Sequence, residues 1–396
     1  MGWLLDALIY GTRGTVSMLN ERYKTREEYL RQPFEDRLIK LSPKQDEHAR
    51  ELCDKHVTVD LHCLSYHQFS DHEQPYPRER VRNSGLTCLL ETVDNFGHNP
   101  DHEYVKAAED ARHFTGFFPG EQGMGIAYTA DDAREAKRDG RQTIMVSMEM
   151  DGSQVIGPGI MYKRGTPEEH YPFLEKINRL HELGLRRFDP IKNFRNYIGD
   201  GCLERSDSGL SHYGLAVVER MNEMGMIIDT SHWGEQSTHN AIEASRDPVL
   251  ISHAGARALV PRNVRLKSDE LIHALADSGG VIGVCGIPNY LSQEKRQGVD
   301  DMVAHIGYIV DLVGVDHVAI GTDIVWGDHA ALPIHHHYIE RMNMKVAAVY
   351  MEGIESLEEW PNIIRSLVHH GYSDHEISKI VGENARRIMK RVFIKP

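Results

Sequence analysis

The amino-acid sequence predicts an α/β protein of the (β/α)8 barrel class, the TIM-type fold in which parallel strands and helices alternate. Three observations lead to this class. Short apolar runs recur about eight times, the number that a closed parallel barrel needs. A longer stretch compatible with a helix follows each run. The runs are continuously apolar rather than alternating, which is typical of parallel strands that helices cover from outside.

The runs that we expect to form the barrel strands share a high content of β-branched and other apolar residues, and several of them stop at a polar side chain. In chain order they are Val57–Leu61, Leu86–Val93, Thr143–Met148, Leu185–Phe188, Met226–Asp229, Val249–Ser252, Gly280–Val284 and His317–Gly321.

Outside these runs the sequence shows few signs of a domain boundary. Residues 1–50 are charged and helix-like, and we expect a helical extension packed on the barrel. No Pro/Gly-rich linker and no internal repeat follows, so residues 51–396 are predicted to form a single catalytic barrel domain. Near the C-terminus Ser373 stands where a helix N-cap belongs, with Glu376 three residues later, and this pair predicts the start of a helix.

The composition of the chain limits the kinds of partner that we expect it to bind. The 396 residues carry a net charge of −14 with scattered basic residues, which disfavours a nucleic-acid partner. The five cysteines form no CxxC pair, so free thiols in a reducing, cytoplasmic compartment are expected. The N-terminal MGWLLDALIYGTRG lacks the features of a secretory leader, and no run is long enough to span a membrane. These features predict a soluble protein that acts on a small molecule.

The polar residues that end the predicted strands carry the chemistry. In barrels of this class catalytic groups lie at the carboxyl ends of the strands, where side chains distant in sequence meet. The residues at these ends are His62, Glu149, His232, His253 and Asp323. Three imidazoles and two carboxylates form a nitrogen and oxygen ligand set that suits zinc or a similar divalent ion. One such residue alone could be a buried histidine or a helix cap; five at equivalent positions predict a metal site.

Other histidines fit a metal site less well. Three neighbouring side chains, His335 to His337, follow Pro333 in an expected loop and cannot all converge on one ion, so a solvated or lid loop is predicted there. The loops after the first two strands contain His67, His98 and His102, which are not expected to be ligands.

At these motifs the sequence resembles the membrane (renal) dipeptidase family, zinc peptidases of the metal-dependent hydrolase superfamily with amidohydrolase-like barrels. The likeness extends over nearly the whole chain after about residue 50. It rests on DTSH at Asp229–His232, ISHAGARALVPRN at Ile251–Asn263, GGVIGV at Gly279–Val284, IGTD at Ile320–Asp323 and VGENARRIMKRV at Val381–Val392.

The resemblance implies a role for each matching residue. Glu149 corresponds to the carboxylate that bridges two metal ions, His232 and His253 to ligands of one ion, and His62 to a ligand of the other. Asp323 corresponds to the catalytic carboxylate that passes a proton from water to the leaving amine and lies beside the metal. Arg262, followed by Asn263, resembles the arginine that grips the carboxylate of the substrate, and a bidentate guanidinium suits that task. A homodimer is also implied.

Three positions depart from the family pattern. The first strand of the family ends in His-x-Asp, whereas this chain has Leu64 at the aspartate position, so one zinc ion is expected rather than two. Asp60, Cys63 or Asp323 could replace the missing ligand. Lys192 stands where the family carries a histidine that stabilises the reaction intermediate, and it could stabilise an oxyanion or bind a substrate anion. Ile287 replaces a substrate-facing aromatic residue.

The sequence therefore predicts a dipeptidase-type, metal-dependent hydrolase that cleaves a dipeptide or small amide with a free carboxylate by means of metal-activated water. An alternative is a diverged barrel enzyme with one metal ion that acts on another small carboxylate compound, by decarboxylation or by cleavage of a lactone or C–N bond. A non-catalytic binding protein is a third reading, which the retained set of polar residues opposes.

Overall fold

A computed structural model of the chain describes residues 39–64, 83–93, 124–157, 171–294, 296–325, 351–354 and 357–393. The predictions made for residues 1–38, for His67, His98 and His102, and for the histidines at 335–337 lie outside these described residues. Within the described residues, no helix has an apolar stretch long enough to cross a bilayer.

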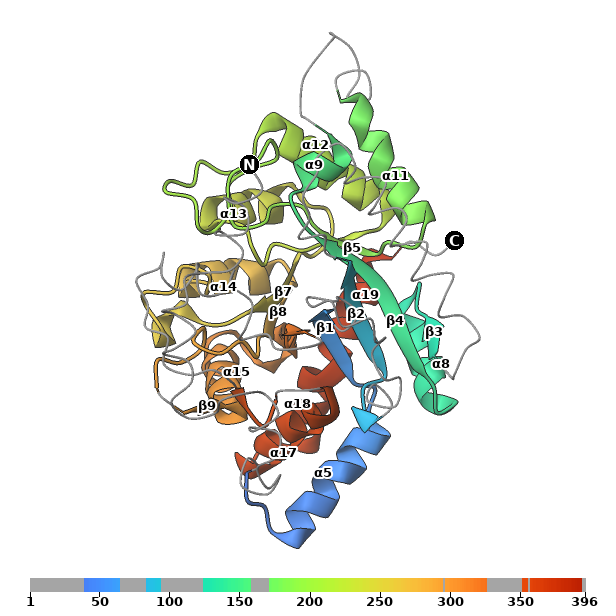
Figure 1. The fold of residues 1–396 in the computed structure, drawn as a ribbon, viewed down its shortest axis with the longest axis vertical. Coiled ribbons are helices and arrows are strands. Elements are labelled where there is room, and N and C mark those ends of the chain that lie inside the picture. The colour runs from blue at the N-terminus through green and yellow to red at the C-terminus, as the bar shows by residue number, and fades with distance from the viewer. Residues whose placement is uncertain are drawn as a thin grey trace, which may run out of the picture.

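Among the described residues, eight parallel strands form the centre of the molecule, and each of the eight predicted runs overlaps one of them (Figure 1). They are β1 (Val59–Leu64), β2 (Cys88–Val93), β4 (Gln142–Glu149), β5 (Arg187–Asp189), β6 (Ile227–Ile228), β7 (Leu250–Ala254), β8 (Val281–Val284) and β10 (Val318–Ile320). Shorter strands accompany them: β3 (Met124–Ile126), β9 (Gln297–Gly298), β11 (Ile324–Val325) and β12 (Met351–Glu352).

The strands close into a barrel. One sheet runs β11-β1-β2-β4-β5-β6 and another runs β10-β8-β7. A single bridge between Asp229 and Leu250 joins β6 to β7, and β11, which directly follows β10, pairs with β1. The backbone N–H of Asp323 also donates to the carbonyl oxygen of His62 at 2.9 Å. The ring of neighbours confirms the predicted barrel class.

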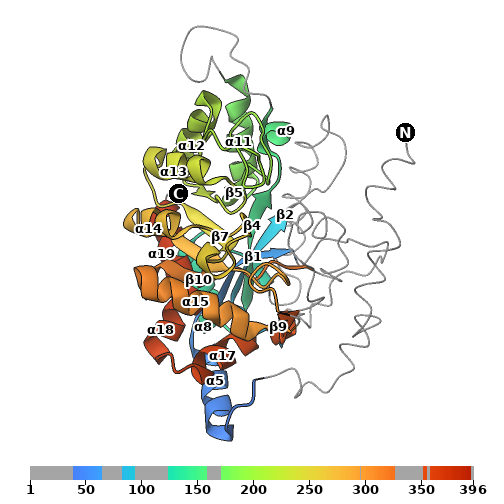
Figure 2. The same cartoon turned by 90° about the vertical axis from the view of Figure 1, so that its left-hand side faces the viewer.

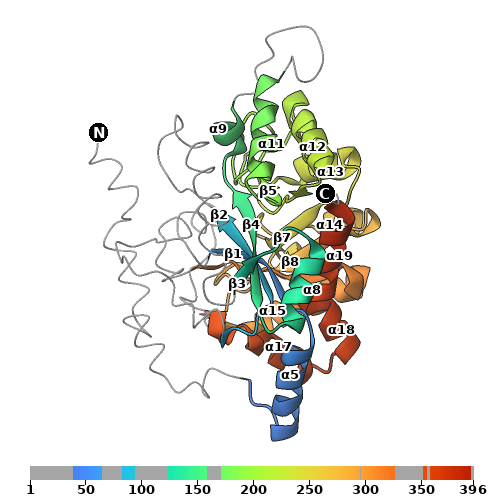
Figure 3. The same ribbon diagram turned by 90° about the vertical axis from the view of Figure 1, so that its right-hand side faces the viewer.

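Helices cover the outside of the barrel, as the alternating pattern predicts. Figures 2 and 3 show α11 to α15 as a layer beside the strands. The helices are α5 (Pro43–Lys55), α8 (Ala130–Arg138), α9 (Gly152–Ile156), α11 (Glu175–Glu182), α12 (His212–Met224), α13 (Glu235–Ala244), α14 (Asp269–Asp277), α15 (Val299–Val313), α17 (Pro361–His369), α18 (Asp374–Ser378) and α19 (Asn384–Val392). A π-helical segment, Lys379–Glu383, leads into α19.

Helix ends follow the capping rules. Ser373 caps α18, and its side chain and that of Glu376 form the predicted reciprocal capping box. Ser42 and Gln45 form the same motif at the start of α5. Because α5 runs continuously from residue 43 to 55, the predicted boundary at residue 50 falls inside one helix.

The core has two parts. One cluster draws apolar residues from most of the strands, including Leu61, Leu90, Met145 and Ile227, and fills the barrel together with residues of α19. A larger cluster lies between the strands and the surrounding helices. All five cysteines are free thiols, as predicted.

Two glycines of the GGVIGV and IGTD motifs permit close strand packing. A Cβ atom on Gly283 would lie 1.9 Å from the carbonyl oxygen of Ser252, and one on Gly321 would lie 1.8 Å from the same atom. Only glycine fits at either position, because real Cβ contacts are far longer. The two residues therefore fix how closely β7, which carries His253, approaches β8 and the end of β10.

Candidate metal centre

Bulges in two strands aim two of the predicted ligands. The register between β1 and β2 shifts between Asp60 and Cys63, and the register between β7 and β8 shifts between Ile251 and Ala254. His62 lies inside the first irregular stretch and His253 inside the second. An extra residue in one strand bends the strand and redirects a side chain, and bulges of this kind are common beside active sites.

The other predicted ligands follow from strand ends and turns. Glu149 is the last residue of β4, and it pairs in register with Asp189, the last residue of β5. His232 lies in the turn that follows β6. Asp323 follows β10 with a φ of 57°, a left-handed conformation that aspartate tolerates better than most residues. Backbone strain of this kind is concentrated at functional sites.

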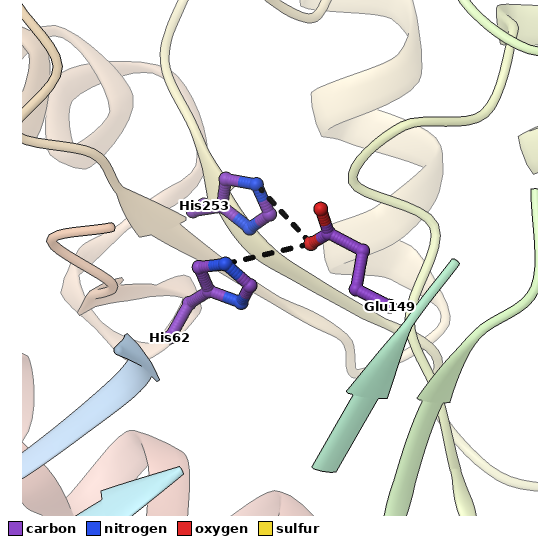
Figure 4. A group of neighbouring side chains, drawn as sticks. All are labelled: His62, Glu149 and His253. Atoms are coloured by element: carbon purple, nitrogen blue, oxygen red, sulfur yellow. Dashed lines mark ion pairs between the residues drawn. The ribbon is translucent and has the colours of Figure 1, made fainter. Parts of the chain in front are cut away.

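These side chains converge on Glu149, as Figure 4 shows for two of the histidines. Glu149 Oε2 lies 3.5 Å from His62 Nε2 and 3.6 Å from His253 Nε2. Glu149 Oε1 lies 2.9 Å from His232 Nε2. Asp323 Oδ1 lies 3.2 Å from His62 Nε2, so the structure brings all five predicted residues together.

The cluster has the features of a divalent metal site. His62 Nε2 and Glu149 Oε2 are buried and have no hydrogen-bond partner within the described part of the chain. Two buried polar atoms left without a partner in this way are costly unless a cation lies between them. Ligand atoms that surround zinc at about 2.1 Å in a tetrahedron lie about 3.4 Å apart. The distances of 3.5 and 3.6 Å from Glu149 Oε2 agree with that spacing. The residues present therefore fit a metal ion.

A hydrogen bond at the far side of the His253 ring supports the same conclusion. His253 Nδ1 lies 2.8 Å from Ser252 Oγ, which can accept its proton, and this leaves Nε2 of His253 as a lone pair. His62 Nδ1 has two neighbours, Thr92 Oγ1 at 3.1 Å and Arg187 Nη2 at 3.0 Å, and the arginine can only donate. The tautomer assigned to His253 in this way is typical of a histidine that binds metal through Nε2.

Local charge favours the protonation states that metal ligands need. Burial lowers the pKa of His253 well below its usual range, and burial together with Arg265 lowers the pKa of His232 to about 4. Burial opposes ionisation of Glu149, but His232, His62 and Lys192 outweigh it and hold its pKa well below the usual range. His232 and His253 are therefore neutral and Glu149 is ionised near neutral pH.

A buried arginine that the sequence analysis did not identify lies beneath the cluster. Arg187 is fully buried on β5, and one of its nitrogens donates to Asp229 Oδ2 and to Ser252 Oγ at 2.6 Å. The other donates to Thr92 Oγ1 at 2.7 Å. Arg187 thereby orients the two hydroxyl groups that contact His62 and His253.

Two further cations hold the turn that carries His232. Lys267 Nζ donates to the carbonyl oxygens of Thr230 at 3.2 Å and Trp233 at 3.0 Å. Arg265 Nη1 donates to the carbonyl oxygen of Ser231, and the backbone N–H of Cys202 donates to that of His232 at 2.8 Å. All four carbonyl groups of the turn are therefore satisfied, which fixes its backbone.

The residues predicted to bind the substrate, Arg262 and Asn263, lie less favourably than the predicted metal ligands. Arg262 is exposed, and it makes no hydrogen bond or ion pair with a described residue of the cluster. Arg265 instead is buried and places Nη2 2.6 Å from His253 Nε2. Asn263 accepts from the backbone N–H of Arg265 and donates to the carbonyl oxygen of Tyr290, so both ends of its amide hold the loop. The structure therefore places Arg265, rather than Arg262 or Asn263, beside the cluster.

The structure also locates the other two residues that the sequence analysis assigned to the substrate site, Lys192 and Ile287. Lys192 Nζ lies 3.3 Å from Glu149 Oε1, at the edge of the cluster. Ile287 is 2% exposed and packs in the core.

Of the three residues considered as replacements for the missing aspartate, Asp60 and Cys63 do not fit the role of a metal ligand. The carboxylate of Asp60 accepts from the N–H and hydroxyl of Thr322, from the N–H of His62 and from Trp360 Nε1. These four donors occupy its lone pairs. Cys63 belongs to neither group of residues that could hold an ion, and burial raises the pKa of its thiol well above the usual range. Asp323 is the remaining neighbour of His62.

Comparisons with known proteins agree with the geometry. The family model described as membrane dipeptidase (peptidase family M19) matches residues 115–331. A dipeptidase of Claviceps purpurea is 26% identical over 272 residues, which are 68% of this chain and 55% of that protein. The chain spans about half the length of the first curated dipeptidases that it matches, from 46% to 60%.

Solved structures share the fold. An amidohydrolase from Pseudomonas aeruginosa superposes with a TM-score of 0.70 and 25% identity, over 87% of this chain and 99% of that one. A metallopeptidase from Rhodobacter sphaeroides, liganded with a phosphinate mimic of the dipeptide L-Ala-D-Ala, superposes with a TM-score of 0.65 over 85% of this chain and 99% of that one. At 18% identity the second likeness shows the fold alone.

Proposed function

The chain belongs to the membrane dipeptidase family, and from this premise we propose that it is a metal-dependent hydrolase that cleaves a dipeptide or small amide with a free carboxylate. The observation that carries this proposal is the pair of buried atoms without a hydrogen-bond partner, His62 Nε2 and Glu149 Oε2, at the centre of the cluster. Zinc is the proposed ion, since imidazole and carboxylate ligands suit it.

The residues that would hold the ion are His62, His253 and Glu149, with His232 and Asp323 beside them. A divalent cation bound there would supply Lewis-acid chemistry, which lowers the pKa of water toward neutrality and polarises the scissile carbonyl. We assign to Asp323, whose Oδ1 lies 3.2 Å from His62 Nε2, the role of accepting a proton from the attacking water and returning it to the leaving amine.

Cationic side chains at the cluster suit an anionic substrate. Arg265 presents a guanidinium at His253, and its planar fork matches a carboxylate. Lys192, beside Glu149, adds positive charge where negative charge develops during amide hydrolysis. We assign substrate anchoring to Arg265 and electrostatic stabilisation to Lys192.

A panel of dipeptides offered to the zinc-loaded protein tests the proposal. We expect turnover of some dipeptides, loss of turnover in His62→Ala, and none for the same peptides amidated at the C-terminus. If no dipeptide or small amide is cleaved while another small carboxylate compound is converted, the reaction that we propose is wrong.

That outcome would favour a second candidate, an enzyme with one metal ion that performs decarboxylation or cleaves a lactone or C–N bond in another small carboxylate compound. The lysine beside Glu149, together with Leu64 at the family's aspartate position, favours this candidate. Carbon dioxide release and product masses distinguish it from peptide hydrolysis.

A cytoplasmic homodimer without a membrane or nucleic-acid partner also forms part of the proposal. The net charge of −14 and the scattered basic residues support one part of it, the lack of a nucleic-acid partner. Light scattering during gel filtration measures the oligomeric state directly.

A further inference from the structure

The two carboxylate oxygens of Glu149 have different neighbours. Oε2 faces His62 Nε2 at 3.5 Å and His253 Nε2 at 3.6 Å, and it has no hydrogen-bond partner in the described part of the chain. Oε1 faces His232 Nε2 at 2.9 Å and Lys192 Nζ at 3.3 Å. A carboxylate that bridges two metal ions would meet a metal site on each side. The Oε2 side has a cation beside its histidine, since Arg265 Nη2 lies 2.6 Å from His253 Nε2. Among the described residues, however, the cationic side chain in an ion pair with Glu149 itself is Lys192, at Oε1.

Lys192 supplies the cation on the Oε1 side. Its side chain is 17% exposed, and its ammonium reaches Glu149 from the segment that follows β5. A divalent ion bound at Oε1 would lie within a few ångströms of this ammonium, in a site shielded from water. Repulsion between like charges is strong at such a distance and weakly screened in a buried site.

His232 can satisfy Oε1 without a metal ion. Its Nδ1 lies 2.7 Å from the oxygen assigned as Asn193 Oδ1, while Asn193 Nδ2 is buried and has no partner among the residues that the structure describes. The oxygen and nitrogen of such an amide are interchangeable in assignment. With the amide reversed, Nδ2 donates to His232 Nδ1, and His232 donates its Nε2 proton to Glu149 Oε1. The same exchange moves Asn193 Oδ1 to the position of the nitrogen and away from Cys202 Sγ. It leaves Glu149 Oε1 with two donors, His232 Nε2 and Lys192 Nζ.

We propose that the Lys192 ammonium takes the place of a second metal ion at Glu149 Oε1, so that the chain binds one divalent ion, on the Oε2 side between His62 and His253. The inference rests on the proposed metal-dependent function and specifies its centre. It also accounts for Leu64, because a chain that holds no second ion needs no carboxylate ligand at that position.

A rival arrangement exists in the same cluster. Glu149, Asp189 and His232 could hold an ion on the Oε1 side, since their ligand atoms lie within 4.8 Å of one another. The oxygens of Asp189, however, already accept from Trp233 Nε1 at 2.8 Å and from the backbone N–H of His232 at 3.2 Å. These bonds fix the turn that carries His232, and an ion there would compete with them as well as with Lys192.

Metal counting on the full-length protein tests the inference. The protein is saturated with zinc, dialysed against metal-free buffer and analysed by elemental mass spectrometry, with cobalt titration followed by visible absorbance as a second readout. We expect one ion per chain in the wild type and in Lys192→Arg, which keeps the charge. We expect a second ion in Lys192→Met, which removes the charge and preserves much of the side-chain length.

A second pair of variants supplies the ligand that the family carries. Leu64→Asp alone is expected to bind its second ion at least about tenfold more weakly than the double variant Leu64→Asp/Lys192→Met, because the ammonium still repels it. Circular dichroism establishes that each variant is folded. If Lys192→Met does not fold, Lys192→Gln takes its place in both comparisons.

Two tightly bound ions in the wild type would overturn the inference and favour the site with Asp189. Equal second-site affinity with and without the Lys192 charge in both backgrounds would overturn it as well. Because ions are counted without substrate, a chain that binds one ion but cleaves no dipeptide contradicts the proposed function alone. A chain that cleaves dipeptides with two ions contradicts this inference alone, and a chain that binds no ion contradicts both.

Discussion

Arg262 and Arg265 lie three positions apart on one loop, and the fold separates them. The guanidinium of Arg265 is buried against His253, whereas the side chain of Arg262 is exposed. The order of residues in the motif favours Arg262, because it directly precedes Asn263. Only the path of the loop, held by the two hydrogen bonds of the Asn263 amide, brings the later arginine to the cluster.

Replacing each arginine with methionine separates their roles. We expect Arg265→Met to raise KM for a dipeptide by about tenfold or more, because a charged hydrogen bond to a carboxylate contributes about 1.5–3 kcal/mol. Arg262→Met, the matched control, should leave KM within about twofold. Steady-state kinetics on the zinc-loaded variants measure both values. Equal effects of the two substitutions on KM would contradict the assignment of carboxylate binding to Arg265.

Lys267 predicts a pH dependence of stability. Burial lowers the pKa of its ammonium from 10.5 to about 8. Below the lower value both the folded and the unfolded chain carry the proton, and the folded state bears the full cost of a buried charge. Between the two values the unfolded chain keeps the proton that the folded chain has lost, so stability from this group rises with pH, by up to about 3 kcal/mol.

Urea denaturation at about pH 7.5 and about pH 10 measures this effect against Lys267→Met, in which the group is absent. We expect the difference in free energy of unfolding to move in favour of the wild type as the pH rises. A difference that stays constant would show that Lys267 titrates alike in both states, and one that moves the other way would show that folding raises its pKa.

At the scale of elements, the strands could be predicted from sequence and the bulges could not. A strand buried on both faces needs a continuous apolar run, and the chain shows that run directly. A bulge is one extra residue relative to a neighbouring strand, so it becomes visible only when the pairing is known. The sequence therefore places His62 and His253 at strand ends, while the bulges that turn their rings toward Glu149 emerge from the structure alone.

The charged residues at and just before β5 are a second case in which the sequence could not predict which way a side chain points. Two adjacent arginines interrupt an apolar run, which signals that one of them faces inward. The sequence does not say which one. In the structure Arg186 lies over the ring of Tyr128 at 5.1 Å, and Arg187 enters the barrel to reach Asp229. Asp189 was likewise missed, because its closeness to Glu149 depends on the register between β4 and β5.

The close packing of β7 against Gly321 yields a prediction about elements. We expect Gly321→Ala to lower the free energy of unfolding by about 3 kcal/mol or more, because its Cβ would strike the backbone carbonyl of Ser252, which cannot move without the strand. Gly125→Ala on β3 is the matched control, since its Cβ would meet nothing closer than 3.6 Å. Chemical denaturation compares them, and equal losses would contradict the packing argument.

At the scale of the whole molecule, one cluster at the carboxyl ends of the strands joins residues from 62 to 323. The sequence could predict which residues gather there, because the barrel topology alone brings strand ends together. It could not predict the orientation of each ring, or that Lys192 would lie against one oxygen of Glu149, since both depend on turns and side-chain packing.

Because the ligands come from distant parts of the chain, metal binding should stabilise the entire fold. An ion at about one hundred times its Kd adds about 2.7 kcal/mol to the free energy of unfolding. We expect a chelator to lower Tm and zinc to restore it, in wild type and in His370→Ala, whose histidine is half exposed and far along the chain. His62→Ala should show no such shift in scanning calorimetry. A chelator effect that persists in His62→Ala would place the ion elsewhere.

The pairing between β6 and β7 determines where the wall of the barrel would open first. Those two strands share a single bridge among the described residues, and the contact from Arg187 through Asp229 to Ser252 crosses there in place of a backbone ladder. His232 follows one strand and His253 belongs to the other, so both rings flank this seam. Local opening of the wall would begin at this point. An ion held by His253 together with His62 and Glu149 would tie β7 to β1 and β4 and slow amide hydrogen exchange beside the seam.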